Sequence, residues 1–228
     1  MNRAEKKILT LETRRRELII ATLESIRKHG YMNSTINTIS AESGLSRGLI
    51  SHYFKNKDDL LQYAFRFLTE ASDELFRYVV RTAAKSQFEK LLYGAMVPFL
   101  GNRPYREIWL HFWSASRFQP ELAEVHRALW RTYREGVRRR IASLAQERGL
   151  EMDDKATALM YTQLIDGLWL GLILENAYDE LTCRRILRDW LCSVFKEDPS
   201  KYPDTPPIDL SVLPGLNAYF ARAATAAA

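Results

Sequence analysis

The stretch STINTISAESGLSRGLISHYFKNK, Ser34 to Lys57, predicts two short helices joined by a tight turn and followed by the start of a third helix. Ser34 is expected to cap the first of these helices, because its hydroxyl can accept a free backbone N–H. Ser43-Gly44 supplies the turn, since glycine takes a positive φ at no steric cost. Ser46 is expected to cap the second helix. Two short helices that meet across a glycine turn are typical of a helix-turn-helix.

The second helix of this stretch has two unlike faces. Ile50 and Phe54 are four residues apart, so they are expected to be buried on one side. Arg47, Ser51 and His52 are left on the open side. A polar and basic outer face is what a helix needs to enter a groove of DNA.

The stretch resembles the DNA-binding domain of TetR-family transcriptional regulators. The matching residues are, in order, Ser34-Thr35, Ile39, Ala41, Gly44-Leu45-Ser46, Gly48, Tyr53-Phe54, Lys57 and Leu60-Leu61. The sub-pattern GLISHYF is closer still to the BetI-like, choline-responsive repressors of that family, since many TetR-type proteins have tyrosine where this chain has Ser51. The alternative is a helical hairpin in an unrelated helical protein.

The resemblance implies a set of DNA contacts. In it Arg47 and His52 approach base edges, while Tyr53 and Lys57 hold phosphates. Asn56 is expected to cap the helix that begins at the end of this stretch, which is the fourth helix of the chain. Lys57 then lies at a helix N-terminus, which also favours a phosphate. The full predicted DNA-binding set is Thr35, Arg47, Gly48, Leu49, Ser51, His52, Tyr53 and Lys57.

The positive charge of the chain is concentrated around this motif. The net charge is +5, and residues 1–57 hold 11 Lys and Arg against 5 Asp and Glu, a net of +6. The rest of the chain is therefore close to neutral. A solvated, charged N-terminus would look the same in isolation, but beside the motif the charge favours phosphate neutralisation.

Composition limits the class of protein. With 46% hydrophobic residues in 228, the chain can bury a core. No uninterrupted apolar run reaches the ~18–20 residues of a membrane span, and the N-terminus lacks the apolar region of a signal peptide. Cys183 and Cys192 do not make a disulfide framework. We therefore expect a cytoplasmic protein that does not enter a membrane.

Apolar residues recur at helical spacing throughout, so the sequence predicts an all-α fold of about nine helices, three in a head and six in a body. Before the motif, one helix is expected from Thr10 or Thr13 to about His29, and after it a long helix begins at Asp58. The further helices are expected from Ser86 to Leu100, from Tyr105 to Arg117, from Gln119-Pro120 to about Arg148, from Asp153 or Asp154 to about Tyr178, and from Thr182 to about Lys196. The predicted domains are a helix-turn-helix domain at 1–57, a helical ligand-binding and dimerisation domain at 58–197 and a Pro-rich tail at 198–228. Asp198 to Pro214 is expected to be extended, and Ala218 to Ala228 to form a weak helical end or none.

Aromatic residues are dense in the body. Their helical spacing predicts a small-molecule site made of Trp109, Trp113, Trp130, Tyr133, Asp166 and Trp169. Several aromatic faces with one carboxylate suit a quaternary ammonium ion, which cannot donate a hydrogen bond and is bound through cation–π attraction. The BetI-like resemblance implies choline. Core packing of the aromatic rings, an arginine partner for Asp166, and an uncharged apolar or aromatic ligand are the alternatives.

A second pattern in the body suggests self-association. Gly167 and Gly171 are four apart on one helix and would let another helix approach closely. TetR-family proteins dimerise through their last two large helices, so the resemblance implies a four-helix interface. Its predicted residues are Leu164, Gly167, Gly171, Leu174 and Tyr178. Close packing within one chain is the alternative.

Signals for catalysis, metal or cofactor binding are weak. His29, His52, His111 and His126 have no partners at metal-ligand spacing, and there is no glycine-rich phosphate loop or nucleophile elbow. The sequence thus predicts a homodimeric repressor of an inverted-repeat operator, with a helical enzyme or adaptor as the rival. It leaves open the operator, the regulated genes, the identity and direction of the effector, and the role of the tail.

Overall fold

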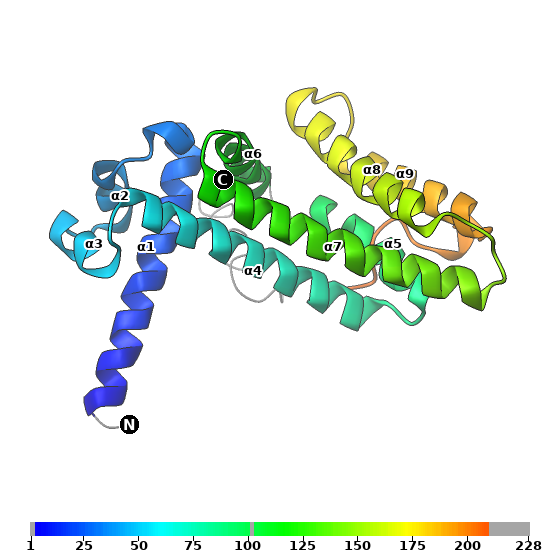
Figure 1. Ribbon diagram of the computed structural model, residues 1–228, viewed down its shortest axis with the longest axis horizontal. Helices are drawn as coiled ribbons and strands as arrows, with labels where there is room; N and C mark the ends of the chain where they lie inside the picture. The colour runs from blue at the N-terminus through cyan, green and yellow to red at the C-terminus, as the bar shows by residue number, and fades with distance from the viewer. Residues whose placement is uncertain (1–2, 101–102, 210–228) are drawn as a thin grey trace. The chain divides into compact units, whose positions relative to one another are not determined.

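A computed structural model describes residues 3–100 and 103–209 (Figure 1). Every regular element in these residues is a helix, which confirms the predicted all-α class. The elements are α1 (Arg3–Asn33), α2 (Ile36–Ser43), α3 (Arg47–Tyr53), α4 (Lys57–Ala83), α5 (Gln87–Met96), the 3-10 turn η1 (Val97–Phe99), α6 (Arg103–Ser116), α7 (Pro120–Glu147), α8 (Asp154–Leu174), α9 (Glu180–Phe195) and the 3-10 turn η2 (Pro199–Lys201).

The described residues form two compact units. One contains residues 3–71 and 103–123, and the other contains residues 72–100 and 124–209. Helix α6 packs on α1 in the first unit, and α5 packs on α9 in the second. The predicted domain division at residues 57 and 197 stays a prediction.

Helix α2 begins one residue later than expected. Its cap is Thr35, whose hydroxyl oxygen accepts the N–H of Thr38 at 3.2 Å, while the Thr38 hydroxyl accepts the N–H of Thr35 at 2.9 Å. Ser34 is fully buried and its hydroxyl donates to the carbonyl of Gly30 at 2.9 Å. The predicted cap at Ser34 was therefore wrong, because that hydroxyl turns inward to a partner on α1.

The other local features of the motif agree with the sequence. Gly44 has a φ of 67°, and the Ser46 hydroxyl accepts the N–H of Leu49 at 3.3 Å. The side-chain oxygen of Asn56 accepts the N–H of Asp59 at 2.8 Å and so caps α4. The turn and two of the three predicted caps are confirmed.

Helix α1 closes the core of the first unit. Leu18, Leu23 and Ile26 are completely buried, as their spacing predicts. Gly30, with a φ of 78°, interrupts the helix as expected, but a further helical turn continues to Asn33. The guanidinium of Arg15 on this helix lies over the ring of Tyr63, 4.1 Å from its centroid.

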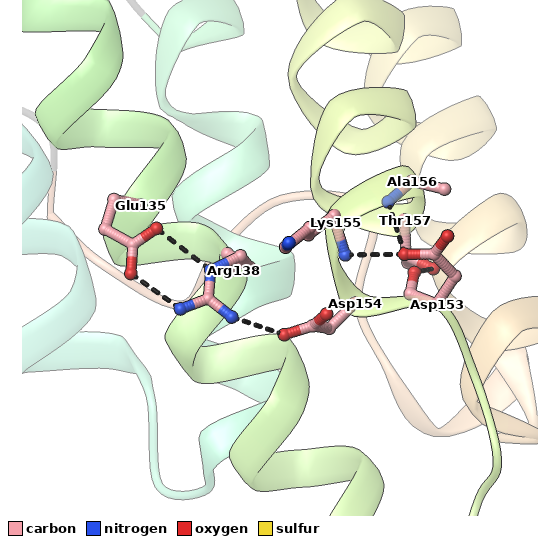
Figure 2. A network of polar contacts seen from close by, with 7 residues as sticks. All are labelled: Glu135, Arg138, Asp153, Asp154, Lys155, Ala156 and Thr157. Carbon is pink, nitrogen blue, oxygen red and sulfur yellow. Dashed lines mark hydrogen bonds and ion pairs between the residues drawn. The ribbon is translucent and has the colours of Figure 1, made fainter.

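Helices α7 and α8 are joined by an ion-pair network in the second unit (Figure 2). The Arg138 guanidinium donates to Glu135 at 2.8 and 2.9 Å on its own helix and to Asp154 on α8 at 2.7 Å. These bonds raise the pKa of Arg138, with the Glu135 hydrogen bond as the largest cause. Beside them Asp153 accepts the N–H groups of Lys155 and Ala156, both at 3.0 Å, and caps α8.

Helix α8 ends earlier than its apolar pattern indicates. It stops at Leu174 rather than near Tyr178, and Asn176 takes a φ of 51°. The chain then turns back, so that the Tyr178 hydroxyl donates to the carbonyl of Leu168 at 3.2 Å and fills the space that a side chain on Gly171 would need. Helix α9 follows at Glu180, two residues before the expected start, with Asp179 as its cap.

In the described residues, α8 is the one helix whose length and apolar composition would suffice to cross a membrane, with a mean hydropathy of 1.3 in its most apolar window. The sequence expectation considered only uninterrupted apolar runs and so did not single it out. Tyr161, Ile165, Trp169 and Leu172 of this helix are buried in the second unit.

The segment after α9 is attached to the second unit. The Asp204 carboxylate bonds Arg185 at 2.8 Å and also Arg188, and the Asp204 carbonyl accepts from Arg184 at 2.9 Å. The Arg185 hydrogen bond is the main reason that the pKa of Asp204 is lowered. The expected extended tail therefore includes a 3-10 turn and a fixed contact within 198–209, while Ala218 to Ala228 lie outside the described residues.

Candidate DNA-binding face and ligand site

Helix α3 presents the side chains that the sequence placed on its open face. Arg47, Ser51 and His52 are exposed, while Ile50 and Phe54 are 1% and 3% exposed. The buried pair fixes the rotation of this short helix against the core. The exposed polar face is therefore open to a nucleic acid.

Positive charge is available at the starts of α3 and α4. On α1, Arg27 and Lys28 pair with Glu24 and Glu42 at 2.9 and 2.7 Å. Among the described side chains, none forms an ion pair with Arg47, Lys55 or Lys57. Unpaired lysine and arginine can neutralise phosphates without first breaking an internal bond.

The start of α4 combines one lysine with two acids. Lys57 is its first residue, and Asp58 and Asp59 follow in the same turn. The Asp59 carboxylate accepts the N–H of Lys55 at 3.0 Å. Because these acids reduce the positive potential of the helix end, a phosphate contact here depends on the Lys57 side chain more than on the helix dipole.

The other predicted DNA-binding residues lie on the same unit. Thr35 is exposed at the start of α2, and Gly48 is exposed on α3, where an added Cβ would meet no described atom within 4 Å. Leu49 and Tyr53 are half-buried on α3, and the rings of His52 and Tyr53 meet edge to face with centroids 5.4 Å apart. All of the predicted set therefore comes from α2, α3 and the start of α4, and its contact with DNA stays a prediction.

A carboxylate and two aromatic residues meet in the second unit. The indole N–H of Trp130 on α7 donates to the carboxylate of Asp166 on α8 at 3.3 Å. Burial raises the pKa of the Tyr133 hydroxyl most, the charge of Asp166 raises it further, and the neighbouring hydroxyl of Tyr161 lowers it by less. Trp169, three residues after Asp166, is 6% exposed and belongs to the core.

Burial raises the pKa of Asp166, whereas the Trp130 hydrogen bond and the charge of Arg134 lower it by less. No ion pair to Asp166 occurs among the described residues, although Arg134 is close enough to act on its charge. The half-buried carboxylate thus loses more stabilisation by water than Trp130 and Arg134 restore to its negative charge. An incoming cation would be attracted to it.

The remaining predicted ligand residues belong to the first unit. Trp109 packs edge to face on Phe65 with ring centroids 5.6 Å apart, and Phe65 also contacts Phe112 at 4.7 Å. The carbonyl of Trp113 accepts from Ser116 at 2.8 Å. Trp109 therefore has a packing role within its unit, and its sharing of one pocket with Trp130 stays a prediction.

Three residues near Asp166 were not predicted. His126 stacks on Trp130 with centroids 4.4 Å apart, Gln163 approaches the Asp166 carboxylate at 3.4 Å, and Tyr161 donates to the carbonyl of Leu91 at 2.7 Å. The four-residue spacing of His126 and Trp130 was a usable signal. Nothing in the local sequence indicated that Tyr161 would meet Tyr133.

Helix α8 carries an exposed apolar stripe. Met160, Gly167 and Leu174 are seven residues apart, which keeps them on one side of a helix, and all three are exposed. Space around Gly167 is open, whereas Gly171 is buried beneath Tyr178. Among the predicted interface residues, Gly167 and Leu174 are thus accessible, Leu164 and Tyr178 are half-buried, and Gly171 has a partner in its own chain.

Comparison with known proteins adds to this geometry. Residues 18–64 match the model of the bacterial regulatory proteins of the tetR family, and residues 91–196 match that of the BetI-type transcriptional repressor C-terminal domain. A relative from Stenotrophomonas maltophilia, the HTH-type transcriptional regulator BetI, is 32% identical over 76% of this chain and 88% of its own length. The chain belongs to the TetR family of transcriptional regulators.

Solved structures agree with the TetR-family assignment. A transcriptional regulator from Pseudomonas aeruginosa PAO1 has a TM-score of 0.70 at 26% identity and covers 84% of this chain and 95% of its own. A regulator from Saccharomonospora viridis, solved in complex with choline, also has a TM-score of 0.70, at 24% identity over 78% of this chain and 94% of its own. As a TetR-family, BetI-type protein the chain is a transcriptional regulator and not an enzyme.

Proposed function

We propose that this protein is a homodimeric repressor that binds an inverted-repeat operator and responds to choline or another quaternary ammonium compound. The head reads DNA through α3, and the body binds the effector beside Asp166. A helical adaptor without DNA binding is the rival for this chain.

The observation that carries the ligand proposal is the position of Asp166. Its carboxylate is half-buried, accepts hydrogen bonds from Trp130 at 3.3 Å and from Gln163 at 3.4 Å, and lacks an ion pair among the described residues. A quaternary ammonium ion has no N–H to donate, so an aromatic face and a nearby carboxylate supply the attraction that it can use. The choline bound by the Saccharomonospora viridis regulator shows that a protein of this fold can hold such a ligand.

The exposed stripe of α8 supports the proposed dimer. Leu174 is 63% exposed and Met160 is 58% exposed, which is costly for apolar side chains in water. Ile186 on α9 is 40% exposed as well. Apolar residues on the two adjacent helices would be covered if the same surfaces of two chains met.

Calorimetry with choline tests the ligand proposal. The parent protein is expected to bind choline at millimolar concentration or below, and Asp166→Asn is expected to weaken binding several-fold because it keeps the shape and removes the charge. Asp73→Asn, an exposed aspartate of the same unit, is the matched control. Absence of heat and of any change in melting temperature with the parent would exclude choline.

An uncharged apolar or aromatic effector is the second candidate. The charge of Arg134 already acts on Asp166, which reduces its need for a cation. Such a ligand should bind Asp166→Asn as well as the parent, whereas a cation should not.

A gel shift with the DNA upstream of the protein's own gene tests the repressor proposal. A retarded band that changes with choline supports it. A folded, dimeric protein that retards neither this fragment nor other duplexes would support the adaptor.

A further inference from the structure

A line of hydroxyl groups connects α1 to α2 inside the first unit. Ser25 on α1 lies 3.2 Å from Ser34 and 2.8 Å from Thr38, measured between the hydroxyl oxygens. Ser34 in turn reaches the Gly30 carbonyl at 2.9 Å. Ser25 and Ser34 are both 0% exposed, so water does not compete for these bonds.

Counting protons gives the line a direction. Each hydroxyl has one proton to donate, and the Ser34 proton goes to Gly30. The proton between Ser25 and Ser34 must then come from Ser25, and the one between Thr38 and Ser25 from Thr38. If Thr38 instead donates to the Thr35 carbonyl at 2.9 Å, Ser25 has one proton for two contacts, so either its contact with Ser34 or its contact with Thr38 is left without a proton.

The surface end of the line is the same in both arrangements. The Thr38 oxygen accepts the N–H of Thr35 at 2.9 Å, and the Thr35 oxygen accepts the N–H of Thr38 at 3.2 Å. The Thr35 hydroxyl proton has only a 3.5 Å contact inside the protein, and Thr35 is exposed. Its O–H is available to a phosphate oxygen.

The far end of the line depends on Gly30. Its φ of 78° turns its carbonyl so that it accepts both the hydroxyl and the N–H of Ser34, at 2.9 and 3.2 Å. A residue with a side chain is strained at such a φ. The kink in α1 therefore supplies the acceptor at which the hydroxyl line ends.

We propose that Ser25 and Ser34 are positioning residues for DNA binding, which hold the start of α2 and the Thr35 hydroxyl in place for a backbone phosphate. The proposal rests on the DNA-binding function proposed above and on Thr35, a member of the predicted DNA-binding set, as one of its contacts. Phosphate contacts carry no sequence information, so loss of the line should weaken all duplexes alike.

Fluorescence anisotropy with two labelled duplexes tests this role. One is the fragment upstream of the protein's own gene, and the other is a random-sequence duplex of the same length. Ser25→Ala is expected to weaken both by about two- to tenfold, the range of a single hydrogen bond, with the preference between them unchanged. Ser25→Cys keeps the shape of the side chain but replaces the hydroxyl by a weaker donor and acceptor, so it should show part of the same loss.

Thr22→Ala is the matched control. Thr22 is also 0% exposed on α1, but its hydroxyl donates to Leu18 in its own helix at 2.7 Å. Its loss of melting temperature should match that of Ser25→Ala without a loss of DNA affinity. Equal losses of DNA affinity in the two variants, or unchanged affinity in a folded Ser25 variant, would overturn the proposal.

A double-mutant cycle with Thr35→Val separates this proposal from the one on which it rests. If both act through the same phosphate, the losses of Ser25→Ala and Thr35→Val are less than additive. A parent that binds no DNA, or a Thr35 variant that binds normally, would remove the proposed Thr35 contact itself. A normal Ser25→Ala beside a weakened Thr35→Val would remove only the hydroxyl line.

Discussion

Single residues of the head are expected to divide between reading bases and holding the backbone. Arg47 is exposed on α3, and Lys57 is the first residue of α4. Neither forms an ion pair with an acid among the described residues, so neither has to break an internal ion pair to contact DNA. Replacing Arg47 and replacing Lys57 should therefore change DNA binding in different ways.

Lys57→Ala is expected to weaken all duplexes alike and to lower the salt dependence of log K by about one unit, because one phosphate contact is lost. Arg47→Ala should cost ~1–3 kcal/mol on the operator and relax sequence preference if its contact with a base is bidentate. Titrations at several salt concentrations measure both effects. Parent-like affinity and slope in both variants would move the DNA-binding face elsewhere.

Asp166 should make effector binding sensitive to pH. The cation is attracted to the ionised carboxylate, so choline affinity should fall as the pH drops below the pKa of Asp166. Because burial raises this pKa, the fall should begin at a higher pH than for an ordinary aspartate. Calorimetry across this range checks it, and Asp166→Asn should show no such decline.

The raised pKa of Asp166 affects the stability of the fold in the opposite direction from choline binding, since stability is favoured by the neutral carboxyl. The neutral carboxyl favours the folded state fully below the unfolded pKa, and this contribution is lost as the pH rises through the folded pKa. Asn at this position should therefore not lower the melting temperature at neutral pH. A large loss would assign Asp166 a structural role that the charge argument omits.

At the scale of elements, what could be predicted was mainly local. The Ser46 and Asn56 caps and the Gly44 turn depend on contacts within four residues, and all are present. The Ser34 cap failed although its partner Gly30 is also only four residues away, because the kink of α1 at Gly30 offers the Ser34 hydroxyl a carbonyl that the residue pattern does not indicate. The end of α8 was misplaced because Tyr178 folds back on Gly171, a contact that helical periodicity cannot reveal.

The ligand site shows the same limit. Trp130 and Asp166 are both in the predicted ligand site, and the structure joins them by a hydrogen bond, while their contact with a ligand stays a prediction. Spacing could not show that Tyr161 meets Tyr133 from another helix, or that Trp109 packs on Phe65. Such pairs depend on how helices far apart in the sequence pack together.

The exposed stripe of α8 gives a prediction at this scale. Gly167→Leu should weaken the dimer, since a Cβ at Gly167 meets nothing within the described part of its own chain and the added bulk would fall in the proposed interface. Sedimentation should show monomer at concentrations at which the parent is a dimer. Gly136→Leu on α7, where the space is also open, is the control. A dimeric Gly167 variant of unchanged stability would place the interface on another surface.

On the scale of the whole molecule, the family domains and the segment beyond them differ in how the chain is held. The BetI-type match ends at residue 196, immediately after α9. Beyond it, the ring of Tyr202 lies 4.8 Å from that of Phe88, and Asp204 bonds the arginines of α9. The chain beyond residue 196 thus has a fixed attachment that the family match does not cover.

Asp204 acts as a built-in counter-ion for α9. A chain shortened after Glu197 would leave Arg184, Arg185 and Arg188 without it, although Arg188 would keep Asp189. Such a chain should need more salt to elute from heparin than one shortened after Asp209, and equal elution would show that the arginines are neutralised in another way. Truncation of this protein to its family domains would therefore create a second polyanion-binding surface, and a gel shift with the shortened chain would overstate its affinity for DNA.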